Sequence, residues 1–296
     1  MAIVTVLTPT YNRKTKLKDL FESLANQQTK DFKWLIVDDG SSDDTESMVS
    51  EWINSADFTI EYHKKVNGGK HTALNYAYQF IQTPLTFIVD SDDSLSADAI
   101  TIIELTYHQY SEEKDLCGFS FLRGTHDGGI LSSARVPEDG MKESYVDCRI
   151  NRNIGGDMAE VWYTDCLKEY PFPEFESEKF LGEDLVWIRM SEKYKMRFFN
   201  KIIYISDYLE DGLTLNRRKH NIASPNGCVK RAEAFLNSNS CFKAKLRAML
   251  QYYIYGRFAG ITISNQFKHV KNKVFYIVLV PFAHIMYIDW KRKNSN

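Results

Sequence analysis

Short apolar runs alternate with amphipathic segments over the first hundred residues. The runs are rich in β-branched and aromatic residues and predict strands at 3–7, 34–37, 58–62 and 85–89. Between them, Leu17, Leu20 and Leu24 recur at helical spacing, and residues 70–81 also favour a helix. This alternation is typical of an α/β fold with a mostly parallel sheet and helices on both faces.

Polar clusters follow three of the predicted strands. They comprise residues 8–12, 38–42 and 90–93. Because ligands of open α/β sheets bind at the carboxyl ends of the strands, these segments are expected to meet at one edge of the sheet. The sequence therefore predicts a binding site built from three loops.

The character of the chain changes after about residue 224. Lys, Arg, Ala and Leu predict helices over 227–236 and 241–255. An apolar run then extends over 274–288, is interrupted by Pro281 and His284, and is flanked by Lys and Arg on both sides. This part of the chain is expected to be entirely helical.

At 15 residues, the run over 274–288 is shorter than a membrane crossing needs. Its flanking cations favour a segment that lies in the interface of an anionic membrane, and a buried core helix or a dimer helix is the alternative. We therefore expect an α/β domain over 1–220 and a helical C-terminal region over 221–296. The partner of that region is expected to be a membrane surface or a second copy of the chain.

Composition narrows the class of protein. The chain has 296 residues, a net charge of −2 and a pI near 6.4, so the total gives no basic field of the kind that nucleic-acid-binding proteins use. Its five cysteines are widely spaced and form no C-x-x-C pair, which favours reduced thiols over disulfides or zinc ligands. With no signal peptide evident at the first residues, a cytoplasmic location is expected.

The segment Asp90-Ser91-Asp92-Asp93 places three carboxylates where a strand should end. Two like charges about 4 Å apart repel by roughly 4 kcal/mol at an effective dielectric near 20, so the cluster favours protonation or a bound cation. In an extended strand Asp90 and Asp92 would share a side, and their oxygen ligands suit Mg²⁺ or Mn²⁺. The alternative is an acidic cap, by Asp93, for a helix that starts near Ala97.

A second acidic strand end, Asp38-Asp39-Gly40, belongs to the same predicted edge. Its acceptors could receive the imide N–H of a nucleobase and ribose hydroxyls. The alternative is an Asx turn that Gly40 closes.

Four ordered motifs resemble glycosyltransferase family 2. They are Thr8-Pro-Thr-Tyr-Asn-Arg13, Val37-Asp-Asp-Gly-Ser-Ser-Asp-Asp-Thr45, Asn67-Gly-Gly-Lys70 with Ala73-Leu-Asn75, and Val89-Asp-Ser-Asp-Asp93. The resemblance covers about residues 1–215 and implies the GT-A fold, a Rossmann-like sheet. It also implies an inverting, metal-dependent transferase that uses nucleotide sugars.

The resemblance assigns roles on the donor side. Thr10 and Tyr11 would border the nucleobase, and Asp39 would accept its N3–H. Asn67 and Lys70 would lie in the loop that closes over ribose and phosphate.

The same resemblance assigns a different role to each aspartate of the acidic cluster. Asp90 would bind ribose, Asp92 would meet Mn²⁺ or Mg²⁺, and Asp93 would share the metal. Many relatives carry a metal-ligating His near position 211; this chain has none there, and Asp211 is the candidate substitute.

Glu183-Asp184 resembles the acidic pair of the family, whose Asp is the general base. Asp184 is therefore expected to deprotonate the acceptor hydroxyl with a raised pKa, and Glu183 to position a substrate. The alternative is a helix N-terminus that favours acids. Asp157 and Trp162 resemble the acceptor-side segment; Trp162 would stack on a sugar ring, or else be a core residue.

The resemblance implies transfer of a hexosyl or N-acetylhexosaminyl group from a nucleoside-diphosphate sugar, with uridine diphosphate favoured over thymidine diphosphate. The acceptor would be a glycan or a lipid-linked molecule in bacterial surface-polysaccharide synthesis, at the inner face of the cell membrane. One alternative is a sugar-1-phosphate nucleotidyltransferase, although the first loop lacks the Gly-rich basic pattern of that class. The other is a non-catalytic scaffold, against which the intact carboxylates argue.

Overall fold

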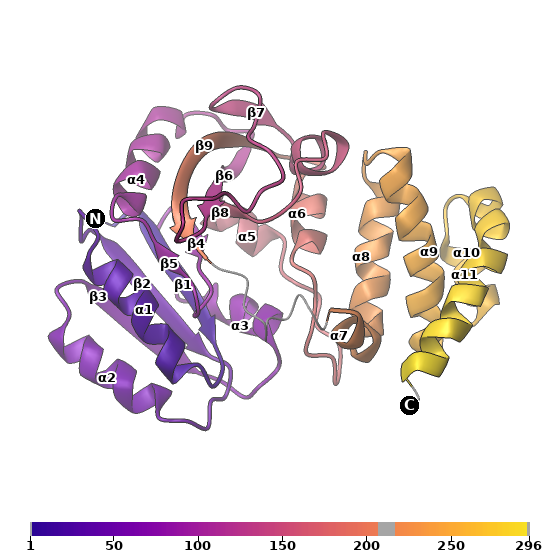
Figure 1. The fold of residues 1–296 in the computed structure, drawn as a ribbon, viewed down its shortest axis with the longest axis horizontal. Helices are drawn as coiled ribbons and strands as arrows, with labels where there is room; N and C mark the ends of the chain where they lie inside the picture. Colours follow the sequence, from indigo (N-terminus) through magenta and orange to yellow (C-terminus); the bar gives the residue numbers. More distant parts are fainter. Residues whose placement is uncertain (1, 207–216, 295–296) are drawn as a thin grey trace.

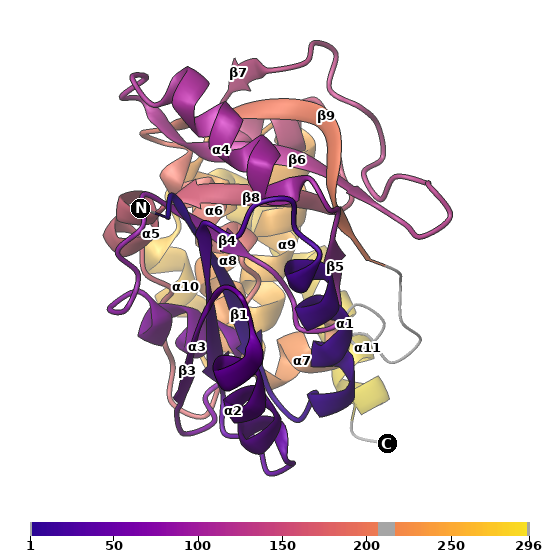
Figure 2. The same cartoon turned by 90° about the vertical axis from the view of Figure 1, so that its left-hand side faces the viewer.

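A twisted mixed sheet forms the centre of the first part of the computed structural model, which describes residues 2–206 and 217–294 (Figures 1 and 2). Its strands are β1 (Val4–Thr10), β2 (Phe32–Asp38), β3 (Thr59–Lys64), β4 (Leu85–Ile88), β5 (Ser94–Leu95), β6 (Leu116–Gly124), β7 (Met141–Glu143), β8 (Met158–Tyr163) and β9 (Lys195–Ile205). The order is β3-β2-β1-β4-β8-β6-β9-β5, and β7 pairs with β9.

The sheet is parallel throughout the half that the sequence pattern described and mixed in the other half. β1, β2, β3 and β4 pair in parallel, whereas β8 runs antiparallel to both β4 and β6. Strands β5 and β7 each pair antiparallel with β9, which itself runs parallel to β6. The expected mostly parallel sheet is therefore a mixed sheet, because β8 enters between β4 and β6 in the opposite direction.

Helices cover both faces of the sheet, as the alternation predicted. The helices of this part are α1 (Lys14–Ala25), α2 (Thr45–Ser55), α3 (Lys70–Ala77), α4 (Ala99–Tyr110), α5 (Thr164–Glu169) and α6 (Asp184–Met190), with a π-helical segment at Val146–Asn151. Val6 faces a core with α1, α2 and α4, whereas Leu7 faces a core with α3, α5 and α6. Successive side chains of a strand point to opposite faces of the sheet, so the adjacent residues Val6 and Leu7 are buried in different cores.

Residues 217–294 form a stack of helices, here called the helical module, at one end of the molecule (Figure 1). Its helices are α7 (Arg217–Ala223), α8 (Pro225–Asn237), α9 (Phe242–Phe258), α10 (Ile263–His269) and α11 (Lys273–Asn294). α8 packs on α6, α9 packs on α8, and α11 packs on α9. The module also has its own core, in which Tyr252, Tyr253 and Tyr276 are buried.

Gly256 allows α9 to approach Gln266 of α10 closely. A Cβ atom at position 256 would lie 1.7 Å from Nε2 of Gln266. That amide is buried, donates to the carbonyl of Tyr253 at 3.2 Å and accepts from the hydroxyl of Tyr276 at 2.7 Å. The glycine therefore lets one buried amide join three helices.

The last helix is longer than the sequence pattern indicated. α11 is continuous over 22 residues with Pro281 inside it. Its length and mean hydropathy of 1.3 are sufficient to cross a membrane, and 11% of its apolar window is buried. The expectation that this segment is shorter than a membrane crossing needs is therefore wrong, because the helix continues through Pro281 and beyond the apolar run over 274–288.

Candidate functional site

The end of β2 organises the loop that precedes α3. Asp39 is 4% exposed and accepts from the backbone N–H groups of Gly68 and Gly69 at 2.9 and 2.7 Å. Lys65 donates to the same carboxylate at 2.9 Å, and the Asn67 side chain donates to the carbonyl of Asp39 at 2.8 Å. Asp39 and Asn67, both candidate donor-binding residues, are thus in contact, and they hold the 65–69 loop against the end of β2.

The first loop lies beside the second. The backbone N–H of Asn12 donates to the hydroxyl of Ser41 at 2.8 Å, and Asn12 accepts from the backbone of Ser42 at 2.8 Å. Tyr11 is 49% exposed, whereas Thr10 is buried and its hydroxyl has no hydrogen-bond partner within the described ranges 2–206 and 217–294. An exposed ring beside an unsatisfied hydroxyl is compatible with the border of a nucleobase site.

The acidic cluster forms a turn instead of continuing a strand. β4 ends at Ile88, and the backbone N–H of Asp93 donates to the carbonyl of Asp90 at 3.3 Å. Asp90 and Asp93 both approach Arg123, at 4.0 and 3.7 Å, whereas Asp92 pairs with Arg13 at 3.0 Å. The expected pairing of Asp90 with Asp92 on one side is wrong, because the turn brings Asp90 and Asp93 together.

Protein cations balance this cluster. Lys70 contacts Asp90, and Arg123 lies 4.0 Å over the ring of Tyr204, whose hydroxyl donates to Asp93 at 2.6 Å. Burial would raise the pKa of Asp90, but Lys70 and Arg123 hold that pKa below its usual value. Burial and the charge of Asp90 raise the pKa of Asp93 to about 7. Asp93 does not cap α4, which begins at Ala99.

Lys70 links the end of β4 to the start of α6. Its ammonium group contacts Asp90 and lies 2.6 Å from Oε1 of Glu183. Burial alone would lower the pKa of Lys70, but the charges of these two carboxylates raise it. Two segments that are far apart in the sequence thus meet at one cation.

Asp184 begins α6, and a residue of the helical module holds it. Arg231 of α8 donates from Nε to Oδ1 at 2.6 Å and from Nη2 to Oδ2 at 2.5 Å. Burial would raise the pKa of Asp184, but this bidentate guanidinium holds it below its usual value. The expectation of a raised pKa was wrong, because Arg231, which faces Asp184, belongs to no motif and is 47 positions away in the sequence.

The acceptor-side residues have different environments. Trp162 is 1% exposed and stacks on Trp187 at a centroid distance of 4.0 Å. It is therefore a core residue, and the prediction that it stacks on a sugar ring was wrong. Asp157 is exposed just before β8. Glu160 lies two positions before Trp162, in the same segment that resembles the acceptor side of the family. Burial raises the pKa of Glu160 to about 7, although Arg149 and Arg123 oppose that rise.

A complete metal site is not preassembled in the described residues. Among residues 2–206 and 217–294, no group of three or more His, Cys, Asp or Glu side chains is arranged to hold a metal ion. The predicted ligand Asp211 lies outside these ranges. Asp92 remains partly exposed and offers oxygen ligands, which suit Mg²⁺ or Mn²⁺ when substrate phosphates supply further ligands.

Comparisons with known proteins agree with this geometry. Residues 5–127 match the model of the family Glycosyl transferase family 2. A GalNAc(5)-diNAcBac-PP-undecaprenol beta-1,3-glucosyltransferase of Campylobacter jejuni is 24% identical over 229 residues, which are 74% of this chain and 70% of that protein. A teichoic acid poly(glycerol phosphate) polymerase of Staphylococcus epidermidis is 33% identical over 99 residues, but these cover 33% of this chain and only 14% of that longer protein.

Solved structures share the fold at low identity. Staphylococcus aureus TarS 1-349 in complex with UDP-GlcNAc has a TM-score of 0.65 and 18% identity, over 98% of this chain and 81% of that chain. The mannosyltransferase PcManGT from Pyrobaculum calidifontis, in complex with GDP-Man and Mn²⁺, has a TM-score of 0.58 and 15% identity, over 99% and 83%. With the match to the family model, its ordered motifs and its GT-A fold, the chain contains a glycosyltransferase family 2 domain over residues 5–127.

Proposed function

We propose that this chain transfers a sugar from a nucleoside-diphosphate sugar to a hydroxyl acceptor, with inversion at the anomeric carbon. The observation that carries the proposal is the bridge that Lys70 makes between Asp90 and Glu183. It sets the end of β4, where a donor would bind, against the start of α6, where Asp184 lies. One displacement between these two groups of carboxylates requires no covalent intermediate.

On the donor side, Asp39 would accept the N3–H of uracil, and Asp90 would bind the ribose. Three cations that now pair with aspartates could bind the diphosphate of a donor instead: Arg13, Lys70 and Arg123. Lys70 is the nearest of the three to Glu183, so the leaving diphosphate would lie beside the acceptor side. The complex of TarS with UDP-GlcNAc supports a uridine diphosphate sugar as donor.

Asp92 would hold Mn²⁺ or Mg²⁺ together with oxygens of the diphosphate, with Asp93 as a further candidate ligand. Such an ion, when bound, neutralises charge on the leaving nucleoside diphosphate. The oxygen-only donor set supports this assignment, and so does the Mn²⁺ of the PcManGT complex.

Asp184 is the proposed general base. Its low pKa keeps it ionised, and each of its two oxygens retains a lone pair beyond the one that Arg231 uses. An acceptor hydroxyl within hydrogen-bond reach could therefore lose its proton to Asp184 while Arg231 fixes the carboxylate. Glu183 would orient the acceptor through its contact with Lys70.

The names of the relatives support a glycan or lipid-linked acceptor in bacterial surface-polysaccharide synthesis, at the inner face of the cell membrane. We also propose that residues 1–220 are the transferase domain and that residues 221–296 are a separate helical region. The division is supported by the additional core of the helical module.

Screening of nucleotide sugars by thermal shift, with and without Mn²⁺, tests the donor assignment. A UDP-sugar at about a hundred times its dissociation constant should add roughly 2.7 kcal/mol of stability. Asp92→Asn should reduce the Mn²⁺-dependent part of that shift, whereas Asp165→Asn, at an exposed position of α5, should not. Release of pyrophosphate from a nucleoside triphosphate would instead indicate a nucleotidyltransferase.

A further inference from the structure

The net charge of −2 conceals a strong division of charge along the chain. Residues 217–296 contain 15 Lys and Arg but only two acidic residues, Glu233 and Asp289, and so carry +13. Residues 1–216 contain 22 Lys and Arg against 37 Asp and Glu, and so carry −15. The total charge gives no basic field, but the helical module alone is strongly basic and should attract an anionic surface.

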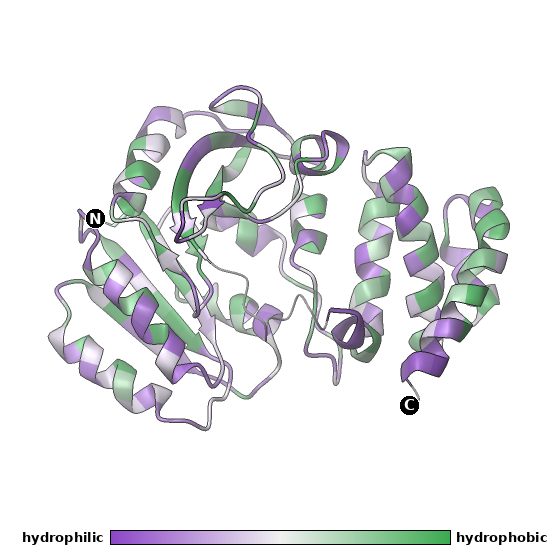
Figure 3. Ribbon diagram, viewed as in Figure 1, coloured by the Kyte–Doolittle hydropathy of each residue, from purple (hydrophilic) through white to green (hydrophobic). Residues whose placement is uncertain are grey.

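The outermost helix of this basic module exposes an apolar stripe, here called the α11 apolar face. It consists of Val274, Ile277, Val278, Phe282, Ile285 and Ile288. Their exposed fractions range from 37% to 74%, and their spacing of three or four residues places them on one side of the helix. In Figure 3 the middle of α11 is largely hydrophobic and its C-terminal end is hydrophilic. So much apolar surface on one face marks an interaction site.

The opposite side of α11 is attached to the module. Tyr276 is buried and donates its hydroxyl to Gln266 at 2.7 Å, and the ring of His284 lies 2.8 Å from the hydroxyl of Tyr253. A helix that crossed a bilayer alone would have to abandon these contacts. Attached to the module on one side and exposing apolar residues on the other, α11 instead has the two-sided form of an interfacial segment. Cations lie near both of its ends: Lys268, Lys271 and Lys273 at the start, and Lys291, Arg292 and Lys293 at the end.

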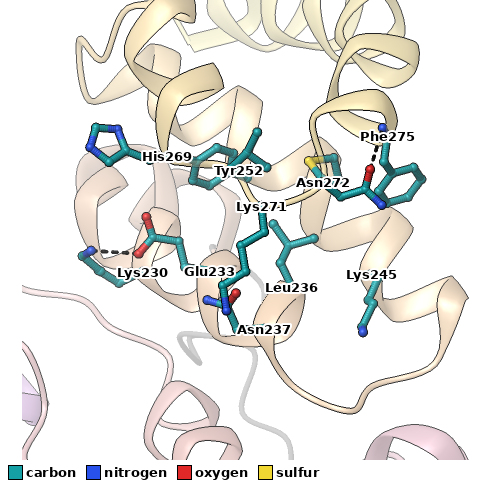
Figure 4. Close-up of a pocket in the computed structure, with 12 residues that line it drawn as sticks. Lys230, Glu233, Leu236, Asn237, Lys245, Tyr252, His269, Lys271, Asn272 and Phe275 are labelled. Atoms are coloured by element: carbon teal, nitrogen blue, oxygen red, sulfur yellow. Dashed lines mark hydrogen bonds and ion pairs between the residues drawn. The ribbon is translucent and has the colours of Figure 1, made fainter.

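A basic cavity lies beside the start of α11 (Figure 4). It has a volume of about 370 Å³, and its lining includes Lys230, Lys245, Lys271, His269, Tyr252 and Phe275. Lys230 pairs with Glu233 at 2.8 Å, whereas Lys245 and Lys271 have no ion pair among the residues that the structure describes. Lys271 and Phe275 flank Val274, the first residue of the α11 apolar face. The cavity is therefore next to the start of the α11 apolar face along the chain.

We propose that the helical module docks on an anionic phospholipid bilayer. The α11 apolar face enters the boundary between headgroups and acyl chains, and Lys245 and Lys271 bind the phosphate of one lipid headgroup in the cavity. The apolar stripe favours lipid over nucleic acid, which would need only the charge. Docking does not depend on the proposed transferase reaction, because vesicle binding is measured without substrate.

Flotation with phosphatidylcholine vesicles, with and without phosphatidylglycerol, tests the docking. Binding should be at least about tenfold stronger with phosphatidylglycerol and should weaken as salt is added. The double variant Phe282→Asp with Ile285→Asp should lower it by about tenfold or more. Leu105→Asp is the matched control, because Leu105 is a 66% exposed apolar residue on α4 of the transferase domain; its binding should equal that of the wild type.

The cavity is tested separately with Lys245→Ala combined with Lys271→Ala, which should weaken binding about tenfold. Lys18→Ala with Lys114→Ala removes two exposed lysines of the acidic part and should change nothing. Circular dichroism confirms that each variant is folded. Equal loss in both lysine pairs would overturn the headgroup site.

Four further results would overturn the docking proposal. The first two are equal binding to neutral and anionic vesicles, and full binding by the α11 double variant. The third is binding of inorganic phosphate or RNA without any vesicle binding. The fourth is a wild-type dimer that becomes monomeric in the α11 variant while vesicle binding stays unchanged. The last would assign the face to a second copy of the chain.

Discussion

The two parts of this molecule handle charge in opposite ways. The part before residue 217 carries −15 and buries its functional carboxylates beside its own cations, as Asp90 shows with Lys70 and Arg123. The helical module carries +13 and keeps an aromatic core with little internal ion pairing. They meet at Asp184 and Arg231, where an acid of one and a cation of the other form a bidentate pair. Under the proposed function, the candidate base Asp184 therefore lies where the two parts meet.

Breaking the ion pair between Arg231 and Asp184 should have the largest effect on stability. Arg231→Leu leaves Asp184 buried without its partner and should lower the free energy of unfolding by about 3 kcal/mol, as removal of one member of a buried pair does. Urea denaturation measures the loss.

Adding Asp184→Asn to the Arg231→Leu variant should restore part of this stability, because the uncompensated charge is gone. If the single and double variants are equally destabilised, the pair does not join the two parts electrostatically.

Glu160 should make the acidic part less stable as pH rises. Its pKa is near 4.5 when unfolded and about 7 when folded, so the folded state binds the extra proton between these values, and stability is lost as pH rises through that window. Glu160→Gln should therefore be more stable than the wild type at pH 8, by up to about 3 kcal/mol, and no different at pH 4. A constant difference across that range would show that Glu160 ionises normally.

The close contact of α9 with Gln266 should have a smaller effect. Gly256→Ala forces the buried amide to move and should destabilise the chain by about 1–2 kcal/mol, since overpacking outweighs the gain in helix propensity. Thermal unfolding followed by circular dichroism measures it. Gly155→Ala is the control, because its Cβ would meet nothing nearer than 3.9 Å; equal effects would refute tight packing of the module.

Much of the first part was predictable because its signals are local. The strands through β4 and the loops at their ends followed from apolar runs and polar clusters. The antiparallel entry of β8 was not predictable, because its pairing with β4 joins residues more than 70 positions apart.

Three residues of the candidate site were not predicted for the same reason: they contact residues far away in the sequence. Arg123, Tyr204 and Arg231 carry no motif, and each reaches an acidic residue that is distant in the sequence. Without Arg231, the pKa of Asp184 could only be predicted from burial, which gives the wrong direction. The charge of the helical module was readable from the sequence, but the total of −2 concealed it.

The most direct test of the proposed chemistry is the rate of sugar transfer by Asp184→Asn at saturating UDP-sugar, with the affinity for UDP measured in parallel. A general base predicts a rate lower by about 10²- to 10⁴-fold with unchanged UDP affinity, while Asp165→Asn remains fully active. Full transfer activity in Asp184→Asn would contradict the assignment of the base at the junction of the two parts.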